Sequence, residues 1–340
     1  MAVREKVRST YERVRPWAPA AFFIGGFLWD AITLGRSITS LDLFILLAYL
    51  AGAATILVAL GSGVAFKGSQ YLKAVLQFFF GGIFSALFIF YFLSSSGLPE
   101  YLVVIGLAAL LLGNEFLESR YSELTLSWTL FTMSAAMFFN FALAHLFRSI
   151  STFWFYLGTL VAVALVLALR KVSKTEAASV WPSIAVAALM LTLHVFNIIP
   201  PVPLVKKEML IAHSVTHRAD GYVAMVESSR WRFWKRSSTT FHDAGDRMYC
   251  FTSVFVPRGI QTTIRHRWLY DAGDEWRNMG VVPFTISGGR EGGYRGYTYK
   301  TRVTPGRWRV IAESESGASI GIIDVVVEPG AVPKLKKVKL

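Results

Sequence analysis

The sequence predicts a membrane all-α part of about seven transmembrane helices, residues 1–203, a C-terminal all-β domain, residues 204–330, and a basic tail, residues 331–340. Two patterns predict this division. Seven apolar stretches fill the first two hundred residues and end at a Pro-rich segment, 197–203. Beyond it, the hydrophobic repeat changes from the period of a helix to the period of two that is typical of strands. The composition agrees, because 54% of the residues are hydrophobic and 17% are charged,.

Each expected span is close to the length that a bilayer requires. A helix needs about 20 apolar residues to cross a hydrocarbon core of about 30 Å. The expected spans are residues 17–35, 41–63, 72–94, 101–117, 125–147, 150–169 and 179–199. Asp30 interrupts the first span, and the fourth is short. The first span is expected to remain as an anchor, because the small residues at 18–21 precede its apolar run, whereas a cleavage site would follow it.

The Lys and Arg residues between the spans predict the orientation of the chain. With a cytoplasmic N-terminus, the opposite side holds two of them, Arg36 and Arg148, and the cytoplasmic segments hold eleven: Arg4, Lys6, Arg8, Arg13, Arg15, Lys67, Lys73, Arg120, Arg170, Lys171 and Lys174. Because cytoplasmic loops are enriched in Lys and Arg, seven spans place the C-terminal domain in a bacterial periplasm, displayed from the inner (plasma) membrane. Six or eight spans reverse this placement. A periplasmic domain excludes nucleic acid as its partner.

The C-terminal domain is expected to be an immunoglobulin-like antiparallel sandwich. Strand patterns cover residues 248–256, 260–270, 281–287, 294–303, 307–313 and 320–327, with weaker ones at 209–216, 221–227 and 231–235. In the second of these strands, His266 and Trp268 point to one face, and Arg265 and Arg267 to the other,. We expect Trp268 and Trp308 to pack in the core, and His266 to be a core histidine bonded to backbone groups instead of a metal ligand or a base.

Five short motifs in this domain resemble a bacterial domain of unknown function, DUF2914. They are Ile264-Arg-His266-Arg-Trp268, Ser287-Gly-Gly-Arg290, Gly293-Tyr-Arg-Gly-Tyr297, Gly306-Arg-Trp308-Arg-Val310 and Gly317-Ala-Ser-Ile-Gly321. The resemblance covers about eighty residues, 247–327. It implies a β fold and a setting in the cell envelope, and it brings no established catalytic residues.

The Gly-rich stretch 287–297 is the most distinctive local sequence. Backbone amides in such a turn can cradle an anion, and arginines can supply forked donors to a phosphate or carboxylate. The alternative is a hairpin whose glycines adopt positive φ. Together with the basic face of strand 260–270, this stretch supplies the tentative binding residues, which are Arg290, Arg295, Tyr294, Tyr297, Arg265 and Arg267.

Other polar patterns predict less. His213 and His217 stand four residues apart, which on a strand separates them by about 13 Å, too far to share a zinc ion. Neither a metal nor another cofactor is expected. The segment 241–246 is expected to be a turn. The aromatic and basic segment 230–236 is expected to touch lipid headgroups or glycans, or to act as a passive interfacial anchor. The basic tail is expected to be solvated, with binding to anionic lipid as the alternative.

Five polar residues fall inside the expected spans, where polar groups are costly. The predicted orientation puts all of them in the outer halves of the first, fifth and seventh spans: Asp30, Asn140, His145, His194 and Asn197. Two interpretations remain open. The five converge beneath the C-terminal domain, or most of them mark helix ends near the lipid headgroups.

This layout carries no catalytic signature of any strength, and we expect that the chain is not an enzyme. The favoured hypothesis is an inner-membrane protein whose β-domain binds an anionic lipid, a glycan or an envelope protein, without chemistry. One alternative is a transporter or channel that uses Asp30 and His145, which a cavity reaching Asp30 would favour. The other is a membrane-embedded enzyme acting on lipid or glycan, which would need an acid and a base within hydrogen-bond reach.

Overall fold

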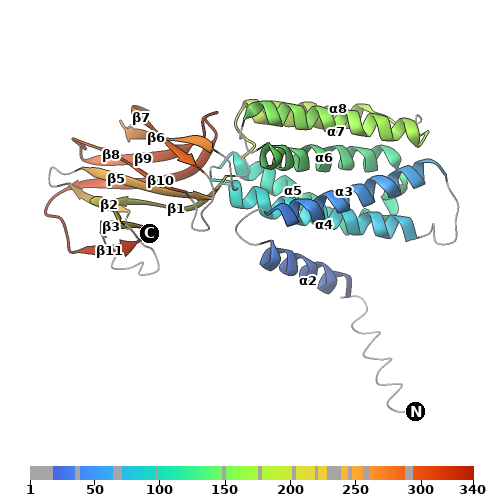
Figure 1. Ribbon diagram of the computed structural model, residues 1–340, viewed down its shortest axis with the longest axis horizontal. Coiled ribbons are helices and arrows are strands. Elements are labelled where there is room, and N and C mark those ends of the chain that lie inside the picture. The colour runs from blue at the N-terminus through green and yellow to red at the C-terminus, as the bar shows by residue number, and fades with distance from the viewer. Residues whose placement is uncertain are drawn as a thin grey trace, which may run out of the picture.

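The computed structural model describes residues 18–34, 39–63, 71–96, 98–147, 151–174, 178–200, 204–218, 221–227, 239–243, 247–255, 261–287 and 294–340. Within these ranges, helices come first in the chain and strands follow. Figure 1 shows the two parts end to end, with the helices side by side at one end and the strands stacked at the other. The predicted division into a helical and a β-rich part is therefore confirmed.

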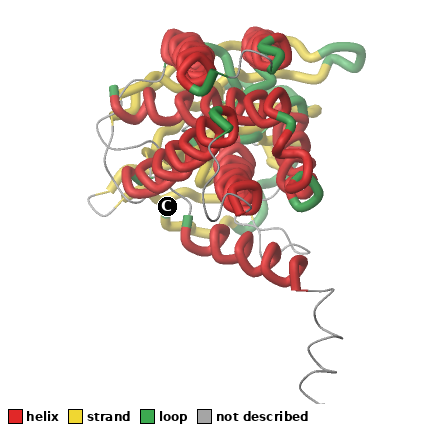
Figure 2. Tube along the Cα trace, turned by 90° about the vertical axis from the view of Figure 1, so that its right-hand side faces the viewer, coloured by secondary structure: helices red, strands yellow, loops and turns green. Residues whose placement is uncertain are grey.

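The described helices match the expected apolar segments. They are α2 (Ala18–Thr33), α3 (Ser40–Gly61), α4 (Leu72–Ser94), α5 (Glu100–Asn114), α6 (Leu124–Leu146), α7 (Thr152–Val172) and α8 (Trp181–Val195), with a short 3₁₀ helix, η3 (Glu118–Ser122), after α5. Four of them, α3, α4, α6 and α7, are long and apolar enough to cross a membrane, and α5 and α8 are shorter apolar helices. Figure 2, which looks along the bundle, shows α2 set apart from the others.

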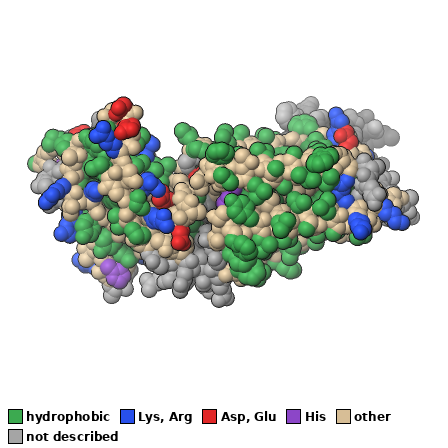
Figure 3. Space-filling model, turned by 90° about the horizontal axis from the view of Figure 1, so that it is seen from above, with side chains coloured by type: hydrophobic (Ala, Val, Ile, Leu, Met, Phe, Trp, Pro, Cys, Tyr) green, Lys and Arg blue, Asp and Glu red, His purple; other side chains and the backbone are tan. Residues whose placement is uncertain are grey.

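Aromatic side chains fill the interior of the bundle. Phe80 and Phe84 of α4 stack at 5.6 Å between ring centroids, and Trp128 and Phe131 of α6 pack edge to face at 6.0 Å. The outer faces are apolar as well, because many large side chains such as Leu160 are exposed. Figure 3 shows hydrophobic side chains over the flank of the bundle. A helix that is apolar on every side suits a lipid environment, where water does not penalise the outer face.

The strands form three sheets. They are β1 (Val205–Ala212), β2 (Ser214–Arg218), β3 (Gly221–Glu227), β4 (Thr240–Asp243), β5 (Met248–Phe255), β6 (Gln261–Asp271), β7 (Trp276–Ser287), β8 (Tyr294–Lys300), β9 (Gly306–Glu313), β10 (Ser319–Pro329) and β11 (Leu335–Lys339). We call the sheet β1-β5-β8 the central sheet, β4-β10-β9-β6-β7 the large sheet, and β11-β3-β2 the small sheet.

The central sheet is covered on both faces. Trp268 and Trp308 of the large sheet pack with Cys250 of the central sheet in one hydrophobic core. On the opposite face, Phe251 of the central sheet packs with Val226 and other residues of the small sheet. Because side chains alternate along a strand, adjacent residues of β5 enter two different cores. The domain therefore has three layers, one more than the sandwich that the sequence predicts.

Three expectations need correction. Strand β4 pairs with β10 in parallel, so the large sheet is not fully antiparallel. Strand β4 lies at an edge of the large sheet, and its neighbours in the chain, β3 and β5, belong to the other two sheets. No hairpin to β10 therefore dictates an antiparallel direction,. The expected turn at 241–246 begins as this strand. The tail expected to be solvated forms β11, because Val338 is buried in the core beneath the small sheet. The expected strand at 231–235 lies outside the described residues.

His266 is buried in the core, as its place in the alternation predicts. Its ring nitrogens lie 2.8 Å from Thr252 Oγ1 and 2.9 Å from Thr298 Oγ1. These partners are side-chain hydroxyls, not the backbone groups that we expected. Burial lowers the pKa of the His266 imidazole to about 3, since a charged ring would lose its hydration. The histidine is therefore a neutral core residue.

The two parts of the chain touch where the α4–α5 connection meets the start of β10. Ser96 Oγ lies 2.8 Å from Ser319 Oγ. Next to this contact, Glu100 begins α5 with 2% of its surface exposed and accepts hydrogen bonds from the amide and hydroxyl of Ser96. Burial lowers the pKa of the Lys206 ammonium, and the charge of Glu100 partly opposes that shift. The β-domain is thus seated on the ends of α4 and α5.

We predict that residues 204–340 fold alone and that Trp308→Ala destabilises them by about 3–5 kcal/mol, because it leaves a cavity in the core between the large and central sheets. Trp276→Ala is the matched control, since Trp276 lies under the Arg309 guanidinium on the outer face of the large sheet. Denaturant unfolding followed by circular dichroism measures both. Equal losses for the two variants would contradict the core assignment.

Candidate functional site

Strand β8 presents an aromatic and basic face. By alternation, Arg295, Tyr297 and Tyr299 share the side of the central sheet that faces the small sheet,. Tyr297 is 37% exposed and Tyr299 is 46% exposed on this edge strand of the central sheet. The residues between them, such as Thr298, point into the opposite core. One face of β8 is therefore buried in the core, and the other face carries exposed side chains.

Two neighbouring strands extend this face. Tyr249 of β5 stands opposite Tyr299, with 5.4 Å between their ring centroids, and lies 5.9 Å from Tyr297. Tyr222 of β3 packs against Tyr297 at 6.2 Å. Cross-strand aromatic pairs of this kind stabilise a sheet and hold the rings in fixed positions. We call these four residues the tyrosine surface.

Two arginines flank the tyrosine surface. The Arg247 guanidinium lies over the ring of Tyr299, 4.8 Å from its centroid. Arg295 Nη1 lies beside Gly221, where it would be 3.1 Å from an added Cβ. Within the described part of the chain, neither guanidinium is paired with a side-chain carboxylate. The surface thus combines flat rings with positive charge.

The other predicted binding residues lie elsewhere. Tyr294 is buried in the core with Val254 and Ile264, so it is a packing residue. Arg290 lies outside the described residues. Arg265 and Arg267 share the outer face of the large sheet, where Glu313 holds Arg267 through two hydrogen bonds of 2.9 and 2.8 Å. Those bonds raise the pKa of Arg267. An arginine held in this way has fewer donors left for an external anion.

The sequence did not single out Arg247, Tyr249, Tyr222 or Tyr299. Tyr299 follows Tyr297 by two residues, so the alternation was a usable signal for it. Of the other three, Tyr249 lies on β5, Arg247 directly precedes that strand, and Tyr222 lies on β3. Their proximity depends on the register of β5 with β8 and on the packing of the small sheet, which no local pattern reveals.

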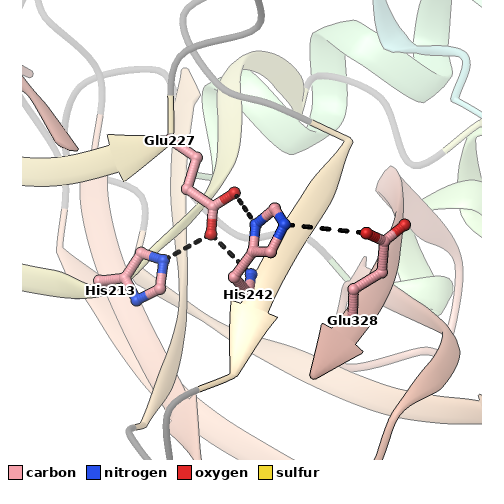
Figure 4. A network of polar contacts seen from close by, with 4 residues as sticks. All are labelled: His213, Glu227, His242 and Glu328. Carbon is pink, nitrogen blue, oxygen red and sulfur yellow. Dashed lines mark hydrogen bonds and ion pairs between the residues drawn. The ribbon is translucent and has the colours of Figure 1, made fainter. Parts of the chain in front are cut away.

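A second polar group joins the small and large sheets. Glu227, at the end of β3, lies with its carboxylate 2.7 Å from His213 Nε2 and 2.9 Å from His242 Nδ1. It also accepts a hydrogen bond of 2.6 Å from the His242 amide. His213 stacks on Phe241 at 4.2 Å, and the other ring nitrogen of His242 lies 3.7 Å from Glu328. Figure 4 shows Glu227 between the two histidines, with Glu328 beyond.

We interpret this histidine–glutamate cluster as a structural link between two sheets. Burial would raise the pKa of the Glu227 carboxyl, but the hydrogen bonds from His242 and His213 outweigh it and the pKa is lowered. The glutamate is therefore ionised and saturated by donors. Among the described residues, no group of three or more His, Cys, Asp or Glu is placed to hold a metal ion. The cluster ties β3 of the small sheet to β4 of the large sheet.

The polar residues of the helices have separate partners. Asn140 Nδ2 lies 3.2 Å from the Tyr91 hydroxyl, and His145 Nε2 lies 2.9 Å from Ser40 Oγ. His194 stacks on Phe155 at 4.0 Å. Asn197 follows α8 with a φ of 54°, a conformation that asparagine tolerates,. Asn140 and His145 therefore each link α6 to another helix, α4 and α3 respectively.

Asp30 lies in a cavity of about 450 Å³ between α2, α3, α4 and α5. The lining includes Glu115 and none of the other four predicted intramembrane residues. Glu115 follows the end of α5 that is distant from the β-domain, whereas His145 and His194 end helices on the near side. Helix length therefore separates the Glu115 carboxylate from the imidazoles of His145 and His194.

Comparisons with known proteins identify the family of one segment. Residues 261–327 match the family described as "Protein of unknown function (DUF2914)", which confirms the resemblance in the C-terminal part. No curated protein matches the chain.

Two solved structures show weak similarity. A β-glucosidase from Listeria innocua in complex with gluconolactone is 10% identical, with 37% of this chain and 16% of that chain covered and a TM-score of 0.20. The Pseudomonas fluorescens alkylpurine DNA glycosylase AlkC bound to DNA containing an abasic site analog is 9% identical, with 83% and 97% covered and a TM-score of 0.24.

We predict that acid weakens the β-domain through Glu227. Because its pKa in the folded state is below the ordinary value of 4.5, its contribution to stability is present above pH 4.5 and is lost as the pH falls further. Thermal melting of residues 204–340 between pH 7 and pH 3 tests this. Glu227→Gln should lower the melting temperature at pH 7 and flatten the decline below pH 4.5, whereas Glu315→Gln, at an exposed site, should do neither. Parallel curves for wild type and Glu227→Gln would contradict it.

Proposed function

We propose that this chain is a multi-span protein of the bacterial inner membrane whose β-domain, on the outer side, binds an acidic glycan of the cell envelope. The observation that carries the proposal is the tyrosine surface with Arg247 and Arg295 at its edge. Tyrosine rings supply a large and rigid contact area at low entropic cost. Guanidinium groups supply forked, charge-assisted donors to carboxylates. A chain of sugar rings that carry carboxylates matches both features.

The ends of the helices support the outer location. Helix α4 ends at the β-domain, so Lys73 near its start lies at the far end of the bundle, about 30 Å away by helix rise,. Arg120 follows α5, which starts at the β-domain, and Lys171 ends α7 just before α8 returns to it. Figure 3 shows Lys and Arg side chains gathered at that far end. The enrichment of Lys and Arg in cytoplasmic loops supports a cytoplasmic far end.

This argument is independent of the number of spans. It compares the two ends of the same helices, so it holds whether or not α2 crosses the membrane. We propose that all seven helices cross, with α5 and α8 as short spans and the N-terminus in the cytoplasm. The apolar faces of α5 and α8, which expose Leu102 and Trp181, support their contact with lipid,.

The prediction for the tyrosine surface uses alginate, a polymer of uronic acids, as the probe and neutral dextran as its control. The full chain in detergent should bind alginate, and raised salt should weaken the binding because charge contributes to it. The double variant Tyr297→Ala/Tyr299→Ala should lose about 30- to 1,000-fold in affinity, since each central aromatic contact contributes on the order of 1–2 kcal/mol and the variant removes two of them.

The control variant is Trp276→Ala, which removes the other described pair of an aromatic ring and an arginine, on the outer face of the large sheet. It should leave alginate affinity unchanged. Unchanged affinity in the double tyrosine variant, or an equal loss in Trp276→Ala, would show that the tyrosine surface is not the binding site. Equal binding of dextran would remove the role of the arginines.

A further inference from the structure

A cavity within the helical part has the size of a small-molecule site. It measures about 450 Å³, is partly open to the surface and lies between α2, α3, α4 and α5. Two consecutive glycines in α4 leave space for the side chains that line the cavity. A Cβ on Gly82 would lie 2.4 Å from the ring of Tyr49, and a Cβ on Gly81 would lie 3.1 Å from Asn114 Nδ2. Any larger residue there would displace these two side chains.

The charge of the lining is acidic. Asp30 and Glu115 both line the cavity, and its described lining includes neither Lys nor Arg. In a membrane, carboxylates without cations are costly and are retained where they serve a pathway or a ligand. The buried hydroxyl of Ser85 also lines the cavity, interacts with Asp30, and makes no hydrogen bond of normal geometry to a described residue. The site therefore has unused polar capacity as well as negative charge.

Aromatic rings complete the lining. Phe27, Trp29, Tyr49 and Phe78 all face the cavity, and the rings of Tyr49 and Phe78 lie 5.8 Å apart at 52°. Aromatic faces attract organic ammonium ions through the ring quadrupole, and cages of such rings bind quaternary ammonium groups. A small metal ion would instead require a shell of oxygen ligands. An anion would be repelled by the two carboxylates.

We propose that this cavity binds an organic ammonium ion, attracted by the carboxylates of Asp30 and Glu115 and packed against the aromatic rings of its lining. The site lies in the helical part and does not depend on the tyrosine surface of the β-domain. With this site, the helical bundle would bind a ligand in addition to anchoring the β-domain. Phe27 packs on Phe88 of α4 at 5.7 Å, so α2 supplies one wall of the site.

The test uses choline, benzyltrimethylammonium and the uncharged carbon isostere of choline, dimethylbutanol, with the full chain in lipid nanodiscs. Isothermal titration should detect binding of at least one ammonium ion and none of dimethylbutanol. The charges of these probes do not change with pH, so loss of binding at acidic pH reports the carboxylates of the site. Absence of binding by both ammonium ions up to about 10 mM, which corresponds to about −3 kcal/mol, would overturn the proposal.

Variants separate the carboxylates from general effects. Asp30→Asn and Glu115→Gln should each weaken ammonium binding at least tenfold. Glu118→Gln is the matched control, because Glu118 is an exposed carboxylate close in the chain that does not line the cavity, and it should bind as wild type does. Unchanged binding in both cavity variants would overturn the proposal. Size-exclusion elution shows whether either variant misfolds. In that case the binding of choline and of dimethylbutanol to the wild-type protein still tests the proposal. Equal binding of the two would indicate an apolar pocket for lipid chains and would overturn the proposal.

Discussion

Lipid offers no hydrogen-bond partner, and this constraint determines the helical part of the molecule. Its segments are helices because a helix satisfies its backbone groups internally, and their polar side chains follow the same rule. Thr132 and Thr159 donate to the carbonyls four residues earlier, and Asn140 contacts the hydroxyl of Tyr91. Asp30 has Ser85 as a partner but no cation beside it, because the described lining of its cavity includes neither Lys nor Arg. A bound cation is the simplest resolution of that imbalance.

In the β-domain, the stacking of the sheets determines which side chains are exposed. The other two sheets cover the two faces of the central sheet, and Tyr297 and Tyr299 of its edge strand β8 remain partly exposed. Burial of Thr298 and His266 beneath β8 makes that strand rigid and keeps Tyr297 and Tyr299 in place. The contact of Ser96 with Ser319 seats the domain on the helix ends. The tyrosine surface and the intramembrane cavity are therefore separate sites in one chain.

The features that depend on local sequence were predictable from the sequence alone. Apolar length predicted the helices, and alternation predicted the strands and the burial of Trp268 and His266. Contacts between distant segments were not predictable in this way. The parallel pairing of β4 with β10, the strand formed by the tail, and the meeting of Glu227 with two histidines depend on how sheets stack. The cavity was missed because its walls require Gly81 and Gly82, whose role emerges only when helices pack.

The most direct test of the account is the side of the membrane on which the β-domain lies. The single cysteine, Cys250, is buried, and burial raises the pKa of its thiol, so it reacts poorly with maleimides,. Cysteines introduced as Lys337→Cys on β11 and Lys171→Cys at the end of α7 are then distinct reporters. In intact spheroplasts, an impermeant maleimide should label Lys337→Cys but not Lys171→Cys. Lys171→Cys should be labelled only once the membrane has been permeabilised. Labelling of Lys171→Cys with protection of Lys337→Cys would contradict an outward-facing β-domain.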